Sequence, residues 1–144
     1  MHIIQIDNFE PTPPHKAVNP QDIHFNHGET VANMLRSGGA EPALSGRIAL
    51  HSFNVGTPEG PDPARTDRWT ARIAEVLERV AAEATNDPGA VDVVCIALQN
   101  PHDTPQTARV REHIETLQAL GIPVVVAAGN RSPNPANPVT CVPN

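Results

Sequence analysis

Two short, nearly continuous apolar runs on either side of a helical segment constrain the fold of this chain most. Residues 91–98 read VDVVCIAL and residues 123–128 read PVVVAA. Strands that are apolar at successive positions are typical of a parallel sheet, in which helices cover both faces. Between the two runs, Thr104 and Pro105 can begin a helix that ends at Gly121. The pattern predicts a strand, helix, strand unit.

The same alternation extends back to the N-terminus. Apolar runs at residues 2–7 and 47–55 predict two further strands. Apolar residues at helical spacing predict one helix after His27 and another over residues 67–84. The expected fold class is therefore α/β: a doubly wound, mainly parallel sheet of about four to five strands, flanked by helices in a three-layer, Rossmann-like arrangement.

The length of 144 residues fits one domain spanning residues 1–144. The chain has 16 prolines, one tryptophan and no tyrosine, so Val, Ile, Leu and Ala must form the core. Residues 131–144 carry four prolines and no periodic pattern, and we expect them to form a proline-rich tail.

The formal net charge of −6 and the absence of any Lys and Arg run argue against a nucleic-acid partner or an anionic membrane partner. The N-terminus MHIIQIDNF lacks a basic region, and its apolar run is too short for a signal peptide. No run of residues approaches a membrane span. A cytoplasmic location is the expectation from these features.

No cofactor or metal is expected from the sequence. The two cysteines, Cys95 and Cys141, are too few for a disulfide framework or a four-ligand zinc site, and we expect free thiols. His24 and His27 with Asp22 nearby resemble a metal pair, but they lack a third ligand at helical spacing.

Three polar residues follow predicted strands or begin a predicted helix. Asp7 ends the first strand, His27 begins the first helix, and Asn130 follows the last strand. Ligands of an open parallel sheet gather beyond the carboxyl ends of its strands, which makes these three the candidate site residues. From spacing alone, Asp7 and His27 could equally be a turn acceptor and a polar residue in a first helical turn, and Asn130 a loop residue.

The segments IIQID, HGETVANML and VVVAAGN, in this order, resemble the subtilisin-like serine proteases, or subtilases. The resemblance covers nearly the whole chain and implies a truncated subtilisin-like fold, with residue 144 falling inside the family's catalytic domain. Phe9 stands where the family usually has a glycine two residues after its aspartate.

The resemblance also implies a role for each candidate residue. His27 would be the general base, Asp7 would orient its ring and stabilise the imidazolium, and Asn130 would donate its amide to the oxyanion. The family's nucleophilic serine follows a Gly-Thr pair, and this sequence contains no Gly-Thr-Ser. We therefore expect a homologue of the serine endopeptidases that does not hydrolyse peptides by itself.

Three functions remain open at this stage. The first is a pseudoprotease that binds a polypeptide ligand, and the second is a protease subunit or fragment completed by another protein chain. The second predicts an exposed sheet edge at PVVVAA, through which a homo-oligomer could also form. The third is a flavodoxin-like or receiver-like domain in which Asp7 and Asn8 bind a cation or accept phosphate.

Overall fold

The computed structural model describes residues 1–9, 26–38, 42–56, 63–98 and 104–127. Strands β1 (His2–Asp7), β2 (Ala49–Asn54), β3 (Val93–Ile96) and β4 (Val124–Val126) form one parallel sheet in the order β2-β1-β3-β4. The helices are α1 (His27–Arg36), α2 (Pro63–Asn86) and α3 (Pro105–Ala119), with a short 3-10 helix at Pro42–Leu44. The predicted α/β class with a mainly parallel sheet is confirmed.

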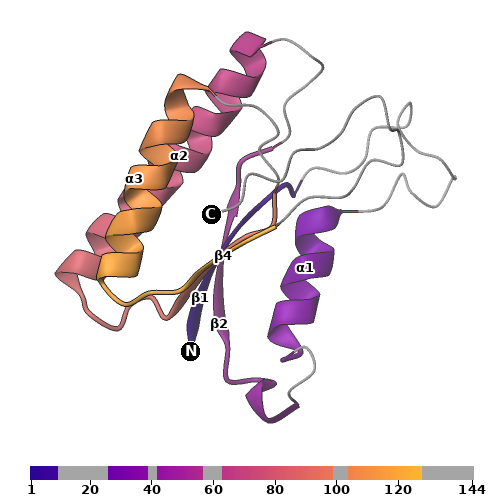
Figure 1. The fold of residues 1–144 in the computed structure, drawn as a ribbon. Coiled ribbons are helices and arrows are strands. Elements are labelled where there is room, and N and C mark those ends of the chain that lie inside the picture. The colour runs from indigo at the N-terminus through magenta and orange to yellow at the C-terminus, as the bar shows by residue number, and fades with distance from the viewer. Residues whose placement is uncertain (10–25, 39–41, 57–62, 99–103, 128–144) are drawn as a thin grey trace, which may run out of the picture.

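The elements form three layers. Figure 1 shows the sheet nearly edge-on, with α2 and α3 on one face and α1 on the other. The chain passes from β1 through α1 to β2 on one side, and from β2 through α2 to β3 on the opposite side. The direction of winding therefore reverses between β1 and β3, which is where open α/β sheets form a crevice at the carboxyl ends of their strands.

The hydrophobic core lies between the sheet and the α2 and α3 layer. Alternate residues of a strand point to the same face, so Ile4 and Ile6 of β1 and Val94 and Ile96 of β3 enter this layer together. The helices contribute the residues that fill the space opposite the strands: Trp69, Ile73, Leu77, Val80, Ala81, Ala84 and Leu117.

Helix α2 is the longest element, with 24 residues, and it begins earlier in the chain than its apolar pattern predicts. Its buried side chains recur every three or four residues, so it presents one apolar face to the sheet and a charged face to solvent. None of the helices in the described ranges is both long and apolar enough to cross a membrane.

Helix α3 begins where the sequence predicts. Pro105 occupies its first position, and the hydroxyl oxygen of Thr107 accepts a hydrogen bond from the Thr104 N–H at 3.0 Å. Leu117 is fully buried against the core near the end of the helix. Gly121, with a φ of +80°, then turns the chain toward β4.

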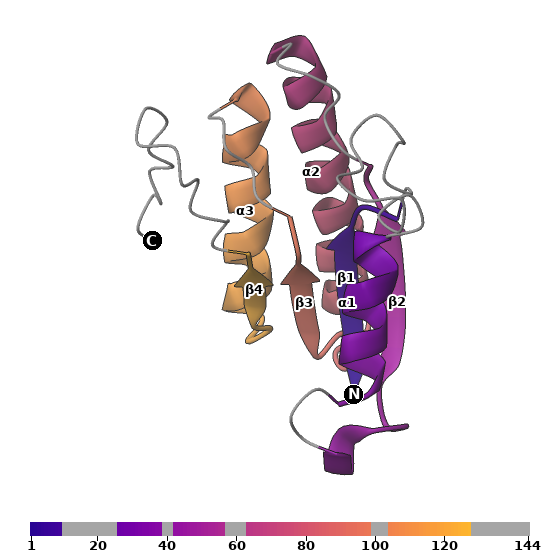
Figure 2. The same cartoon turned by 90° about the vertical axis from the view of Figure 1, so that its right-hand side faces the viewer.

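The described residues cover the opposite face of the sheet only in part. Helix α1 packs on β1 and β2, and Figure 2 shows β3 and β4 beside it with no described helix in front of them. Val93 and Cys95 of β3 point to this face and are only half-buried. The prediction that residues 91–98 are covered by helices on both faces is therefore met on one face only within the described part of the chain.

Candidate active site

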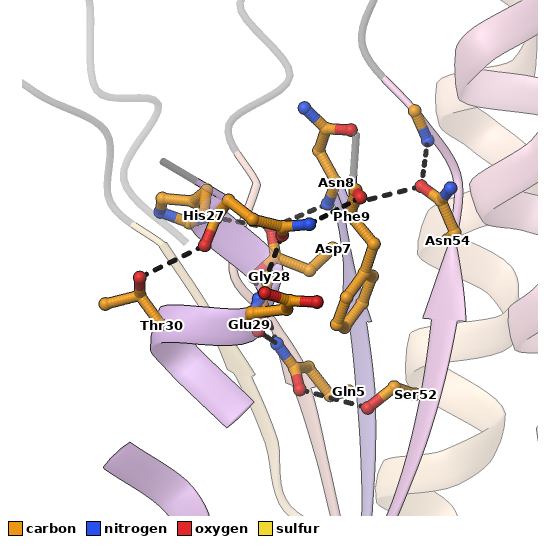
Figure 3. A network of polar contacts seen from close by, with 12 residues as sticks. Gln5, Asp7, Asn8, Phe9, His27, Gly28, Glu29, Thr30, Ser52 and Asn54 are labelled. Carbon is orange, nitrogen blue, oxygen red and sulfur yellow. Dashed lines mark hydrogen bonds and ion pairs between the residues drawn. The ribbon is translucent and has the colours of Figure 1, made fainter. Parts of the chain in front are cut away.

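Asp7 and His27, predicted separately from the sequence, lie in contact at the carboxyl end of β1. Asp7 is the last residue of this central strand, and its side chain is 0% exposed. His27 is the first residue of α1, and its side chain is 46% exposed. The Nδ1 atom of His27 lies 2.7 Å from Oδ1 of Asp7 (Figure 3).

This contact determines the tautomer of the histidine ring. A carboxylate oxygen only accepts hydrogen bonds, so Nδ1 of His27 must carry the proton that it shares with Asp7. In the neutral ring the second nitrogen, Nε2, is then the basic atom. The pair consequently combines a buried acceptor with an accessible imidazole that is oriented to take up a proton.

The start of α1 is fixed by Asn26. Its side-chain oxygen accepts a hydrogen bond from the Glu29 N–H at 3.0 Å, which caps the helix, and its Nδ2 donates to the Phe9 carbonyl at 2.6 Å. The cap therefore ties the first turn of α1 to the residues that follow β1. His27, the next residue, is held beside Asp7 as a result.

Gly28 lets α1 approach β1 closely. Its N–H donates to the Asn8 carbonyl at 2.8 Å. A Cβ atom on this residue would lie only 2.8 Å from the Asn8 carbonyl oxygen and from two ring carbons of Phe9. Phe9 is thus accommodated because the helix presents a glycine to its ring.

The end of β2 supports the same segment. The side-chain oxygen of Asn54 accepts hydrogen bonds from the Phe9 N–H at 3.1 Å and the Gly56 N–H at 3.0 Å. The Gly56 carbonyl in turn accepts from the indole N–H of Trp69 at 2.9 Å. The residues after β1 are therefore anchored through β2 to the core helix α2.

Gln5 is a residue of the site that the sequence argument missed. It is fully buried in β1 and its Nε2 donates to Oδ2 of Asp7 at 3.1 Å and to the Gly28 carbonyl at 2.9 Å. The available signal was a lone amide inside the apolar run IIQID. The sequence analysis treated this run as a strand and as a motif that ends in Asp7, and it assigned no role to the amide.

Asn130, the third candidate, lies outside the described residues, as do His24, Asp22, Cys141 and the proline-rich segment 131–144. The structure therefore brings together two of the three predicted site residues. In the described ranges, no group of three or more His, Cys, Asp or Glu side chains is arranged to hold a metal ion.

Cys95 of β3 is a free thiol beside the site. It pairs in register with Gln5 of the neighbouring strand, so its side chain points to the face that carries Asp7. Burial raises the pKa of the Cys95 thiol above its ordinary value, and the nearby negative charge of Asp7 raises it further. Both effects keep the sulfur in its weakly nucleophilic thiol form.

Comparison with known proteins returned no match among protein-family models, curated proteins or solved structures.

The close approach at Gly28 predicts that Gly28→Ala displaces α1. We expect a loss of about 1 to 3 kcal/mol in the free energy of unfolding, typical of overpacking, measured by urea denaturation. A crystal structure of the variant should show a longer distance between Nδ1 of His27 and Oδ1 of Asp7. Gly121→Ala is the control for geometry: alanine is strained at the φ of +80° and should also lower stability, but Gly121 lies between α3 and β4 and its substitution should leave this distance unchanged. Unaltered stability and geometry in Gly28→Ala would contradict the close packing.

The raised pKa of Cys95 predicts slow alkylation near neutral pH. In a Cys141→Ala background, the rate of reaction with iodoacetamide should reach half its maximum at a higher pH than for an exposed cysteine, since only the thiolate reacts. Asp7→Asn removes the repelling charge but not the burial, so it should move the profile part of the way to lower pH. Identical profiles for the two proteins would show that Asp7 does not act on the thiol.

Proposed function

We propose that this chain is a subtilisin-like serine peptidase homologue in which Asp7 and His27 form the acid and base members of the catalytic triad. The observation that carries the proposal is the 2.7 Å contact between a fully buried carboxylate and an accessible imidazole at the end of the central strand. The motif order IIQID, HGETVANML and VVVAAGN supports the same assignment. In this proposal Asn130 is the donor to the oxyanion.

The chemistry of the pair is that of a general base. With a nucleophilic hydroxyl present, Nε2 of His27 would remove its proton, and the buried Asp7 would stabilise the imidazolium without itself being protonated. The proton would later pass from Nε2 to the leaving amine. Helix α1 holds the ring by its first turn, so the base is already oriented before a substrate arrives.

The nucleophile is the missing member. The hydroxyls of two described serines donate hydrogen bonds elsewhere in the protein. Ser37 donates to the Met34 carbonyl, and Ser52 donates to Oε1 of Gln5. Neither interacts with His27, and none of the four serines of the sequence follows a Gly-Thr pair. In subtilisin, loss of the nucleophilic serine lowers kcat on the order of 10⁶-fold. We therefore propose that this chain by itself binds polypeptide without cleaving it.

The receiver-like alternative fits the site less well. A cation site would require the Asp7 carboxylate to face an open position. Its Oδ1 instead accepts from His27 and from the Asn8 N–H, and its Oδ2 accepts from Gln5. Three donors of the protein already contact this buried carboxylate, which favours a role in orienting His27 over a role in binding a cation.

The proposal predicts that neither a fluorophosphonate probe nor a fluorogenic peptide library reports activity in the isolated chain. Titration with unstructured peptides should instead shift the amide NMR signals of residues 7–9 and 26–30. His27→Ala should weaken these shifts, while His51→Ala should not, because His51 is an exposed histidine of the edge strand β2.

Two results would contradict the proposal. Labelling or cleavage that His27→Ala abolishes would mean that the chain contains a nucleophile that the assignment lacks. Peptide-induced shifts that avoid residues 7–9 and 26–30 altogether would mean that the polypeptide ligand does not bind at the Asp7 and His27 pair.

A second candidate, completion by another protein chain, is favoured by the surface of β4. Val125 and Val126 are 56% and 49% exposed, and within the described part of the chain β4 pairs only with β3. A strand of this kind offers unpaired backbone groups and apolar side chains to a further strand. The added strand would come from a complementing protein or from a second copy of this chain.

This candidate predicts concentration-dependent self-association. Light scattering should show species larger than a monomer, and Val125→Lys should shift them toward the monomer because a lysine on an edge strand opposes strand pairing. Leu120→Lys is the matched control, since Leu120 is 45% exposed but follows helix α3. A wild-type chain that stays monomeric at every concentration, or an equal effect of both lysines, would argue against pairing of β4 with a second copy of this chain.

A further inference from the structure

Gln5 carries a buried side-chain amide in the middle of the central strand. Its side chain is 0% exposed, and its neighbours in sequence, Ile4 and Ile6, belong to the hydrophobic core. Burial of an amide without partners is unfavourable in a protein interior. An apolar residue at this position would pack between β1 and α1 without that cost, so the amide requires an explanation in its contacts.

The contacts fix the orientation of the amide. Oδ2 of Asp7 and the Gly28 carbonyl oxygen both accept, so the group that faces them must be the Nε2 donor, at 3.1 Å and 2.9 Å. The opposite end, Oε1, accepts from the Ser52 hydroxyl at 3.2 Å. Both protons of the Nε2 group are therefore used, and the amide is held between three structural elements.

These elements are the ones that must be aligned for the histidine to meet the aspartate. Gln5 and Asp7 are two residues apart in β1, so their side chains share the face on which α1 packs. Gly28 follows His27 in the first turn of α1, and Ser52 lies in β2. A single amide thus contacts Oδ2, the carboxylate oxygen that does not face His27, and the helical turn that carries the base (Figure 3).

We infer that Gln5 is a positioning residue of the proposed site, which holds the Asp7 carboxylate and the first turn of α1 in the geometry that keeps the proton on Nδ1 of His27. The inference rests on the proposed function of the Asp7 and His27 pair. Gln5 does not contact His27 through any hydrogen bond described above, so it acts through Asp7 and Gly28.

The test follows the Nδ1 proton of His27 by ¹⁵N-edited NMR of the full chain. Gln5→Met keeps an unbranched side chain of similar length but removes the donor to Asp7 and Gly28. Because hydrogen bonds to a charged group are among the stronger ones, we expect the Nδ1 proton to exchange with water about tenfold faster in this variant. Gln5→Glu, which places an acceptor opposite Asp7, should have at least as large an effect.

Two controls separate positioning from general stability. Ser52→Ala removes the partner of Oε1 and leaves both Nε2 contacts in place, so it should accelerate the exchange less than Gln5→Met does. Thr70→Val removes a buried hydroxyl that donates to the Thr66 carbonyl in α2, away from the site. It should lower the melting temperature without changing the exchange of the His27 proton.

The outcomes distinguish the inference from the function on which it rests. A wild-type chain whose His27 ring is protonated on Nε2 alone overturns the proposed function. If the Nδ1 proton of His27 exchanges at the same rate in the wild-type chain and in Gln5→Met, the positioning role is overturned and the Asp7 and His27 pair is left intact. If neither Gln5 variant folds, the wild type decides: we expect the Gln5 side-chain amide protons to be protected from exchange and to show contacts with Gly28, and rapid exchange would overturn the inference.

Discussion

A carboxylate buried at the end of a central strand has to be supplied with hydrogen-bond donors, because an unpaired buried charge costs several kcal/mol. Asp7 is in this position, between β2 and β3 and with 0% of its side chain exposed. The Asn8 N–H, the Gln5 amide and Nδ1 of His27 supply the donors. Gln5 lies within β1 and His27 lies in α1. The sequence of β1 and the placement of α1 therefore both serve the Asp7 carboxylate.

The arrangement of the sheet explains why that carboxylate lies beside the first turn of α1. Winding reverses between β1 and β3, so α1 and the α2 and α3 pair lie on opposite faces, and Asp7 lies at the carboxyl end of a strand beside this switch point. The contact of Gly28 with Asn8 and Phe9, and the cap at Asn26, then fix the height of α1 above the strand. His27 remains half-exposed because it is the first residue of that helix.

Much of this architecture could be predicted from the chain. The apolar runs located the four strands, and helical periodicity located the three helices, because both signals are local. The residues Asp7 and His27 were also identified, but their contact was not, since it depends on how a helix docks on a strand 20 positions away. The Asn26 cap, the Gly28 and Phe9 packing and the role of Gln5 escaped for the same reason. The sequence also predicted that helices cover both faces of residues 91–98, whereas Cys95 is only half-buried. A continuous apolar run does not reveal that α1 packs on β1 and β2 instead of β3.

The central claim is that Asp7 holds the proton of His27 on Nδ1 and leaves Nε2 as the base. Neutron diffraction from deuterated crystals of the wild-type chain tests it most directly, because it locates the deuterium atom in the contact. We predict a deuterium on Nδ1 pointing at Oδ1 of Asp7, across a distance close to the 2.7 Å found here. A ring with deuterium on Nε2 alone, or an imidazole turned away from the carboxylate, would contradict the account.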